Sequence, residues 1–357
     1  MSSVKLGLGL ETWSSATAEI PLARIQRAEA LGFHSVWSAE AYGADALIPL
    51  AYIAAHTRSI GLATGLLQVS ARPATTAAMS LATLAQLAPG RRIIAGVGVS
   101  GPQVVEGWYG QPWGLPLTRL REYVEVMRMA LRREGPVEFH GREIDLPYAG
   151  PGSSGFGKPL KPILRAPDRI EIWPAGGGPR AVEQAARTGD GWLPMGFRPG
   201  ILDHYRPALE KGLGQRPDGL TLQDFPIWPI LPVVGTDDVG ATIESLKPSI
   251  AMFVGGMGAR EKNFHKEQMA RCGFGAEADR VQELWLAGER KAAAAAVPDA
   301  YPDETRLIGP PARIRERWPA WERAGATGYT IFVQDESSLE LIALLAGTRD
   351  QVPQDVG

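Results

Sequence analysis

The fold is predicted most strongly by one stretch, Arg92-Ile-Ile-Ala-Gly-Val-Gly-Val-Ser-Gly-Pro-Gln-Val-Val-Glu-Gly-Trp108. It opens as an unbroken apolar run, which is typical of a parallel strand buried on both faces. It then reaches Gly98, Gly101 and Pro102, where the backbone can approach a ligand closely, and polar residues follow at once. Because α/β enzymes build their sites at the carboxyl ends of parallel strands, this stretch predicts both a strand and part of a site.

Strand patterns alternate with helical patterns along nearly the whole chain. The expected strands are Val4–Leu10, Ser35–Ser38, Ile60–Leu67, Arg92–Val97, Ile170–Ala175, Gly191–Met195, Ile227–Val234 and Tyr329–Val333. The expected helices are Ile20–Leu31, Leu47–Thr57, Pro73–Leu87, Leu115–Arg133, Pro179–Arg187, Ala312–Ala324 and Ser338–Leu345. Eight strands with intervening helices, in a 357-residue chain that exceeds the ~250 residues typical of the fold, predict an α/β protein: a (β/α)8 TIM barrel with insertions.

The chain is expected to form a single domain over residues 1–357. Its main insertion is expected at about 246–304, between Leu246 and Glu304, with helical patterns at Asn263–Ala270 and Ala276–Ala296. An open doubly wound sheet is the alternative. It is the weaker one, because the first strand-to-helix turn, Glu11-Thr-Trp-Ser-Ser15, lacks the Gly-x-Gly-x-x-Gly fingerprint.

Composition disfavours several classes of function. The formal charge of −2 and the scattered basic residues favour neither a nucleic-acid partner nor an anionic membrane. No apolar run reaches ~18 residues and the N-terminus lacks the features of a signal peptide, so a cytoplasmic protein is the default expectation. The single cysteine, Cys272, allows no intramolecular disulfide, and no motif around it indicates a nucleophile.

Metal and hydrolase sites are also disfavoured, and no metal is expected. The histidines fall on different elements without paired spacing, and no Gly-x-Ser-x-Gly elbow exists. These histidines are His34, His56, His140, His204 and His265. The tryptophans, which include Trp13, Trp37, Trp108, Trp113 and Trp192, are expected mostly in the core, although a few at strand ends could wall a planar cofactor.

Candidate site residues follow two of the early strands. Glu40 lies in Ser38-Ala-Glu-Ala-Tyr42 and would point into the barrel mouth as a hydrogen-bond acceptor or proton carrier; the alternative is a salt-bridged loop glutamate. The third strand ends with Gly65, the lone polar Gln68 and then Arg72. Gly65 could mark a β-bulge.

A glycine-rich turn follows the fifth strand. Ala175-Gly-Gly-Gly-Pro-Arg180 leads into a helix, so free amide N–H groups would lie beside the positive end of the helix dipole, and Arg180 adds a cation. Glycine-rich turns are often only turns. In a barrel that holds a ligand, however, this one predicts a phosphate site formed by Ala175, Gly176, Gly177, Gly178 and Arg180, and hence a bound organic cofactor.

Four segments resemble the bacterial luciferase-like monooxygenase superfamily, in its branch dependent on coenzyme F420, a deazaflavin. They are Thr64-Gly-Leu-Leu-Gln-Val-Ser-Ala-Arg-Pro73, Ser100-Gly-Pro-Gln-Val-Val-Glu-Gly-Trp108, Gly255-Gly-Met-Gly-Ala-Arg-Glu-Lys-Asn-Phe264 and Leu307-Ile-Gly-Pro-Pro311. The second and third are the most specific. Within this branch the chain resembles methylene-tetrahydromethanopterin reductase and deazaflavin-dependent oxidoreductases of actinobacteria.

The resemblance implies that the deazaflavin ring sits in the barrel mouth against an arch in the third strand, with a non-prolyl cis peptide between Gly65 and Leu66. The implied cofactor site comprises Gly65, Leu66, Gln68, Ser100 and Gly101, with the phosphate at Gly176–Gly178. Glu40 occupies the position of an acidic residue near the ring, and so becomes the candidate catalytic residue.

Two residues depart from the sugar-phosphate dehydrogenases of this superfamily. Ala41 stands where they have a catalytic histidine, and Pro102 stands where they have a glutamate. Both differences argue against that reaction. They leave the proton donor open among Glu40, Tyr42 and a water.

The expected function is hydride transfer between C5 of coenzyme F420 and an unsaturated or carbonyl-type small molecule. An FMN-dependent monooxygenase, whose phosphate would use the same turn, and a non-catalytic flavin-binding protein are the alternatives. A homodimer is expected because relatives pair through barrel helices and the chain has apolar helix positions at Ala78, Leu81, Leu84 and Leu87.

Overall fold

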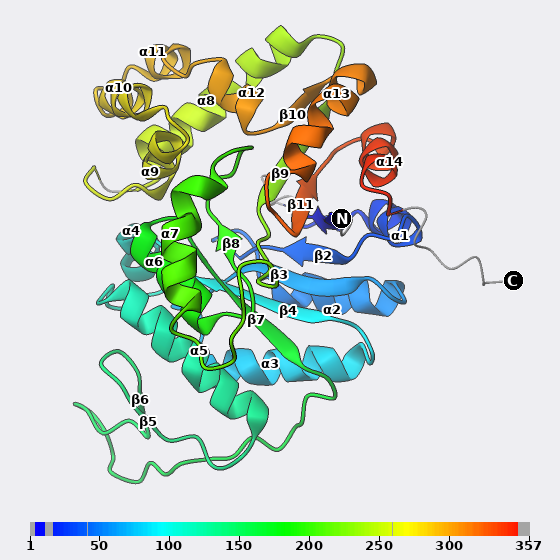
Figure 1. Cartoon of the computed structure of the whole chain (residues 1–357). Coiled ribbons are helices and arrows are strands. Elements are labelled where there is room, and N and C mark those ends of the chain that lie inside the picture. Colours follow the sequence, from blue (N-terminus) through cyan, green and yellow to red (C-terminus); the bar gives the residue numbers. More distant parts are fainter. Residues whose placement is uncertain (1–3, 11–16, 41, 259, 349–357) are drawn as a thin grey trace, which may run out of the picture.

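The computed structural model describes residues 4–10, 17–40, 42–258 and 260–348, and its centre is a curled parallel sheet. The strands follow one another in the order β10-β9-β11-β1-β2-β3-β4-β7-β8. Their bounds are β1 Lys5–Gly9, β2 Ser35–Ser38, β3 Gly61–Gln68, β4 Ile93–Gly98, β7 Ile170–Gly176, β8 Leu193–Pro194, β9 Ile230–Gly235, β10 Leu307–Gly309 and β11 Gly328–Phe332. A small antiparallel hairpin, β5 Phe139–His140 with β6 Asp145–Leu146, lies apart from this sheet (Figure 1).

The sheet closes into a barrel where β8 approaches β9. Trp192, just before β8, forms a parallel bridge with Ile227; its amide donates to the carbonyl of Pro226 at 2.8 Å, and its own carbonyl accepts from the amide of Trp228 at 3.0 Å. β9 pairs with β11 through its first half and with β10 through Val233–Gly235, so β10 is an additional strand outside the barrel.

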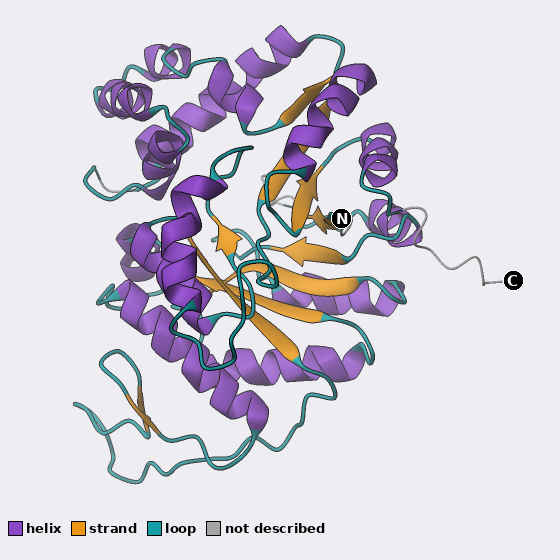
Figure 2. Ribbon diagram, in the orientation of Figure 1, coloured by secondary structure: helices purple, strands orange, loops and turns teal. Residues whose placement is uncertain are grey.

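Helices cover the outside of the sheet, and five further helices form a separate group at one side of the barrel (Figures 1 and 2). The first set is α1 Leu22–Ala30, α2 Leu47–His56, α3 Ala74–Leu87, α4 Pro102–Gly107, α5 Pro116–Arg132, α6 Pro179–Thr188, α7 Leu202–Leu213, α13 Pro311–Glu322 and α14 Glu336–Leu345. The second set, which we call the lid, is α8 Val239–Gly256, α9 Phe264–Arg271, α10 Gly275–Leu286, α11 Arg290–Ala295 and α12 Ala300–Glu304. Within the described residues, no helix is both long and apolar enough to cross a bilayer.

The eight expected barrel strands and the seven expected helices are all confirmed, with ends that shift by a few residues. The expected helical pattern Ala276–Ala296 is two helices, because Gly288 adopts a φ of +85° between them. The expected insertion boundary at Leu246 falls inside α8. Sequence patterns missed α4 and β10, which are too short for periodicity, and α7, whose interior contains Pro207.

The apolar positions of α3 serve the core of the chain. Ala78, Leu81 and Leu84 are 1%, 0% and 3% exposed, whereas Leu87 is 65% exposed. The expectation that the first three present an apolar face to a partner is therefore wrong. They are buried because α3 packs against α2, α5 and the strands beneath it.

Glycines in β4 allow β3 to approach unusually closely. The hydroxyl of Thr64 donates to the carbonyl of Gly96 at 2.9 Å, and a Cβ at Gly96 would lie 2.0 Å from the Thr64 carbonyl oxygen. A Cβ at Gly98 would lie 2.6 Å from a methyl group of Leu66. The Ala-Gly-Val-Gly pattern of β4 is thus required by the path of its neighbour.

Three tryptophans close the barrel interior. The ring centroids of Trp37, Trp173 and Trp228 lie 5.6–5.8 Å apart, and all three side chains are buried. The Trp37 indole N–H donates to the hydroxyl of Ser35 at 2.8 Å, and that of Trp228 to Thr330 at 3.0 Å. This aromatic floor separates the two ends of the barrel and supports whatever lies above it.

We expect Gly96→Ala to destabilise the protein by about 1–3 kcal/mol or more, because the new methyl group meets a backbone oxygen that cannot rotate away. Gly107→Ala is the matched control, since a Cβ there meets no atom within 4 Å. Urea unfolding of both variants measures the difference. Equal stability of the two variants would contradict this account of the β3–β4 contact.

Candidate active site

A cavity of about 950 Å³ opens where the carboxyl ends of the barrel strands face the lid. Trp37 and Trp228 of the aromatic floor form its base, together with Phe332 and Leu193. Lid residues contribute the opposite wall. A volume of this size is typical of sites that hold a cofactor or a drug-sized ligand.

The structure brings nearly all predicted site residues to this one cavity. Those that line it are Glu40, Gly65, Leu66, Gln68, Ser100, Ala175, Gly176, Gly177, Gly178 and Arg180. Gly101 is the exception. It stands at the N-cap of α4, and a Cβ built on it meets no atom within 4 Å.

The end of β3 is arched. Its pairing with β4 shifts register between Thr64 and Leu67, and the peptide bond between Gly65 and Leu66 is cis, so both the expected bulge and the expected cis bond are confirmed. The Leu66 carbonyl accepts from the amide of Glu40 at 3.0 Å. The arch is thereby joined to the β2 loop and presents backbone to the cavity.

Glu40 is buried at the edge of the cavity, at 8% exposure. One carboxylate oxygen accepts from the amide of Gln68 at 2.9 Å, and the other accepts from Arg72, which also binds Asp45 at 2.7 Å. Burial raises the pKa of the Glu40 carboxyl, while the Gln68 amide and Arg72 partly offset that effect. Glu40 is therefore both ion-paired and able to retain a proton more readily than an exposed glutamate.

Gln68 has an unused polar atom. Its backbone amide binds Glu40, but its side-chain carbonyl oxygen is buried without a hydrogen-bond partner. Buried polar groups are nearly always paired, so an unpaired acceptor in a cavity wall indicates a ligand donor. A ring N–H of a planar cofactor would fit it.

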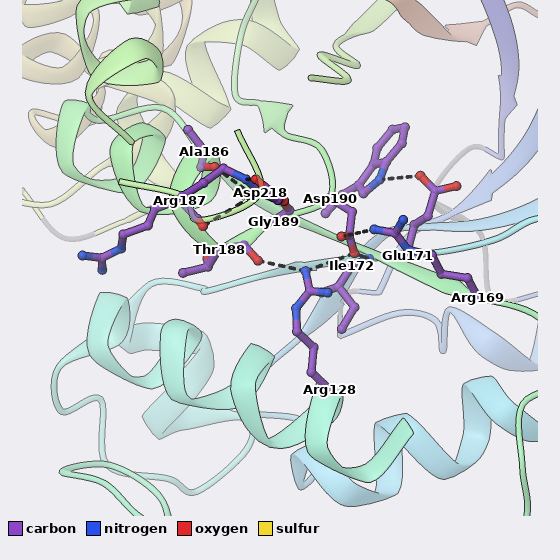
Figure 3. A network of polar contacts seen from close by, with 12 residues as sticks. Arg128, Arg169, Glu171, Ile172, Ala186, Arg187, Thr188, Gly189, Asp190 and Asp218 are labelled. Carbon is purple, nitrogen blue, oxygen red and sulfur yellow. Dashed lines mark hydrogen bonds and ion pairs between the residues drawn. The ribbon is translucent and has the colours of Figure 1, made fainter. Parts of the chain in front are cut away.

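The glycine turn at Gly176–Gly178 opens α6 without a side-chain cap. Pro179 has no N–H, so the groups of the first helical turn that remain free for an anion are the amides of Arg180 and Ala181. The strand before the turn and the helix after it are fastened by a polar network at their ends away from the turn (Figure 3). Asp190 accepts from the β7 amide of Ile172 at 2.8 Å and pairs with Arg128 at 3.0 Å.

The far end of α6 is held as well. Arg216 donates to the carbonyls of Ala186 at 3.2 Å and Gly189 at 2.7 Å, and Asp218 pairs with it at 2.6 Å. A guanidinium at the C-terminus of a helix also complements its dipole. The turn is thus set between a strand and a helix that are both fixed.

Sequence reasoning missed the wall that the lid contributes. Lys262, His265, Gln268, Arg271 and Arg306 line the cavity. His265 packs against Phe253 with ring centroids 4.9 Å apart, and burial lowers its pKa. Lys262 belongs to a segment quoted for the family resemblance, but no spacing in the sequence indicates which side of α9 faces the barrel.

Charge in the cavity is unbalanced. Its charged side chains are Arg180, Lys262, Arg271 and Arg306 against Glu40 and Glu267. The excess of cations suits a ligand with at least one anionic group. With the unpaired Gln68 oxygen and the uncapped glycine turn, the site fits a planar cofactor that carries a phosphate.

Other candidates from the sequence are less well placed. Tyr42 is 57% exposed and does not line the cavity. Cys272 is buried, and burial raises its pKa to about 11, so it remains a thiol at neutral pH. Glu11, Trp13 and Ala41 lie outside the described residues. Among the described residues, no group of His, Cys, Asp or Glu side chains gathers in an arrangement that could hold a metal ion.

Both a family model and the sequences of known proteins match this chain. The family model described as luciferase-like monooxygenase matches residues 11–328. The chain is 40% identical over 329 residues to a putative coenzyme F420-dependent oxidoreductase of Mycobacterium tuberculosis, covering 91% of this chain and 94% of that protein.

Solved structures share the fold at lower identity. The coenzyme F420-dependent tetrahydromethanopterin reductase of Methanopyrus kandleri superposes with a TM-score of 0.75 at 21% identity, covering 96% of this chain and 97% of that one. An F420-dependent secondary alcohol dehydrogenase, solved with an F420–acetone adduct, gives 0.74 at 18% identity, covering 97% and 99%.

Proposed function

The chain belongs to the luciferase-like monooxygenase family, and from that membership we propose that it is a coenzyme F420-dependent oxidoreductase. It would transfer a hydride between C5 of the deazaflavin and an unsaturated or carbonyl-type small organic substrate. The observation that carries the proposal is the shared cavity, in which the arch at Gly65–Leu66 and the uncapped glycine turn line one continuous space.

The residues present fit such a cofactor at both of its ends. Gly65, Leu66 and Gln68 would hold the ring, with the unpaired Gln68 oxygen accepting from a ring N–H. Ser100 and the glycine turn would hold the polar tail and its phosphate. When bound, the deazaflavin supplies hydride chemistry at a carbon centre, and the protein supplies binding, orientation and electrostatics.

Glu40 is the proposed catalytic residue. Its carboxyl lines the cavity beside the arch, its orientation is fixed by the Gln68 amide and Arg72, and burial favours its protonated form. It would hydrogen-bond the cofactor ring or hold the proton that accompanies hydride transfer. A general acid needs a pKa nearer to the working pH than that of an exposed carboxyl, and the direction of the Glu40 shift meets that need.

We expect the purified protein to bind oxidised F420 more tightly than FMN. The cavity offers excess positive charge to the longer, more anionic tail of F420. Fluorescence titration with each cofactor under the same salt conditions measures both dissociation constants. Tighter binding of FMN would overturn the cofactor assignment and favour a flavin monooxygenase of the same family.

Glu40→Gln should reduce kcat by about 10²-fold while the fold and cofactor binding persist, because the amide keeps the shape but cannot carry the proton. Asp45→Asn is the control, since Asp45 shares Arg72 with Glu40 but does not line the cavity. Its kcat should change much less. Full activity of Glu40→Gln would make Glu40 a structural residue and direct attention to His265, the titratable imidazole in the lid wall.

We also propose a homodimer and a cytoplasmic location. The single buried cysteine is compatible with a reducing compartment. α2 and α3 expose large apolar side chains: Ile48 is 72%, Met79 is 52% and Leu87 is 65% exposed. Exposed apolar side chains on adjacent helices favour self-association.

Light scattering at micromolar concentration should give twice the chain mass. Leu87→Glu should shift the protein towards monomer, because a charge would have to be buried in the interface. Leu344→Glu, at a similarly exposed site on α14, should not. A monomeric wild-type protein would end this part of the proposal.

A further inference from the structure

One lid side chain lies directly against the glycine turn. The guanidinium of Arg271, the last residue of α9, lies so close that a Cβ built on Gly177 would be 2.5 Å from its Nη2 atom. Arg271 also lines the cavity. Arg271 of the lid and Gly177 of the barrel are therefore in close proximity just before α6.

The charge of Arg271 is poorly neutralised where it stands. Its side chain is only 13% exposed, and its Nε is buried with no hydrogen-bond partner. Its ion pair with Glu267 has an N–O separation of 3.6 Å, which is too long for a hydrogen bond. The neutral hydroxyl of Tyr205 lies beside the guanidinium, but no carboxylate of the described residues is within hydrogen-bond distance. Burying a cation without a close anionic partner is costly, so the arrangement is suited to an anion that completes it.

Arg180 differs from Arg271 in this respect. Although it follows the glycine turn in the sequence and was predicted as its cation, it is exposed, and nothing fixes its guanidinium among the described contacts. A phosphate bound at the free amides of α6 would contact Arg271 on the side of the phosphate that faces the protein interior. The buried guanidinium therefore interacts with an anion under weaker solvent screening than the exposed one.

We propose that Arg271 is the main cationic ligand of the cofactor's phosphate, and that the phosphate thereby joins the lid to the barrel. This inference rests on the proposed function only in requiring a phosphorylated cofactor at the glycine turn. The anion would be held between the helix N-terminus of α6 and the guanidinium from α9. Loading the cofactor would then fix α9 over the cavity.

The position of α9 matters for the rest of the site. His265 and Gln268 precede Arg271 by six and three residues, so the three side chains lie on one face of the helix, and all three line the cavity. Holding Arg271 therefore also sets the substrate-facing groups of the lid. The bound phosphate would in this way position His265 and Gln268, which line the cavity farther along α9.

Two ligand pairs test the role of Arg271 in binding: F420 against the ribityl deazaflavin that lacks the phosphate, and FMN against riboflavin. We expect Arg271→Gln to weaken binding of the phosphorylated member of each pair about 30-fold or more. Binding of the phosphate-free member should change less than twofold. The affinity of Arg271→Lys for the phosphorylated member should fall between those of the wild type and Arg271→Gln. Arg280→Gln, which removes an equal charge from an exposed site on α10, should bind as wild type. Circular dichroism and thermal midpoints establish that each variant is folded.

Gly177→Ala gives an independent test from the barrel side. No positive φ restricts this position, so the new methyl group should chiefly displace the Arg271 guanidinium. Its loss of affinity for the phosphorylated ligand should resemble that of Arg271→Gln, and the double variant should be no worse than either single one. Additive losses would mean that the two residues act separately and would overturn the shared site.

Hydrogen exchange measures the coupling to the lid. Phosphorylated cofactor should slow amide exchange across residues 260–272 in the wild-type protein but not in Arg271→Gln. Equal weakening of both members of a ligand pair, or unchanged affinity in Arg271→Gln, would overturn the inference. Preference of the wild type for FMN would overturn the F420 assignment alone, because the FMN pair still reports on Arg271. Binding of none of the four ligands would overturn both.

Discussion

The close approach of β3 to β4 is the constraint on which the candidate site depends. At Gly96 the Thr64 carbonyl leaves room only for a hydrogen atom. At Gly98 the side chain of Leu66 occupies the space that a Cβ would need. This contact allows β3 to arch instead of continuing in regular register. The arch then fixes Glu40 through two backbone contacts, one with Leu66 and one with Gln68. The close packing of β3 against the glycines of β4 thus determines the position of the Glu40 carboxyl.

The two halves of the cavity are supported in different ways. On the barrel side, buried carboxylates and arginines fasten the strands and α6, with Asp190 binding a β7 amide and Arg216 closing the end of α6. On the lid side, α9 contributes long polar side chains whose partners are fewer and more distant, as the Arg271–Glu267 separation of 3.6 Å shows. Both walls leave polar groups for a ligand: the barrel wall has the Gln68 side-chain oxygen and the uncapped turn before α6, and the lid wall has Arg271.

The sequence predicted the barrel side well because its signals are local. Unbroken apolar runs predict buried parallel strands, and glycines or lone polar residues directly after them predict the mouth of a barrel. The lid side could not be predicted in the same way. Arg271 becomes a site residue only because α9 packs with one face towards Gly177, and that choice depends on tertiary contacts. The same reason explains the error on Ala78, Leu81 and Leu84, whose apolar character alone did not distinguish core from surface.

The chain leaves the barrel for the lid and returns to it at neighbouring points. β9 ends at Gly235, and β10, where the lid finishes, pairs with the last residues of β9 from Val233 onwards. An inserted segment whose ends are adjacent can change in length or sequence without altering the register of the strands that carry it. The lid can therefore differ in length or sequence while the barrel that carries it stays the same. Exchange of the segment between β9 and β10 would replace the lid wall of the cavity, Arg271 included, while the barrel wall stayed as it is.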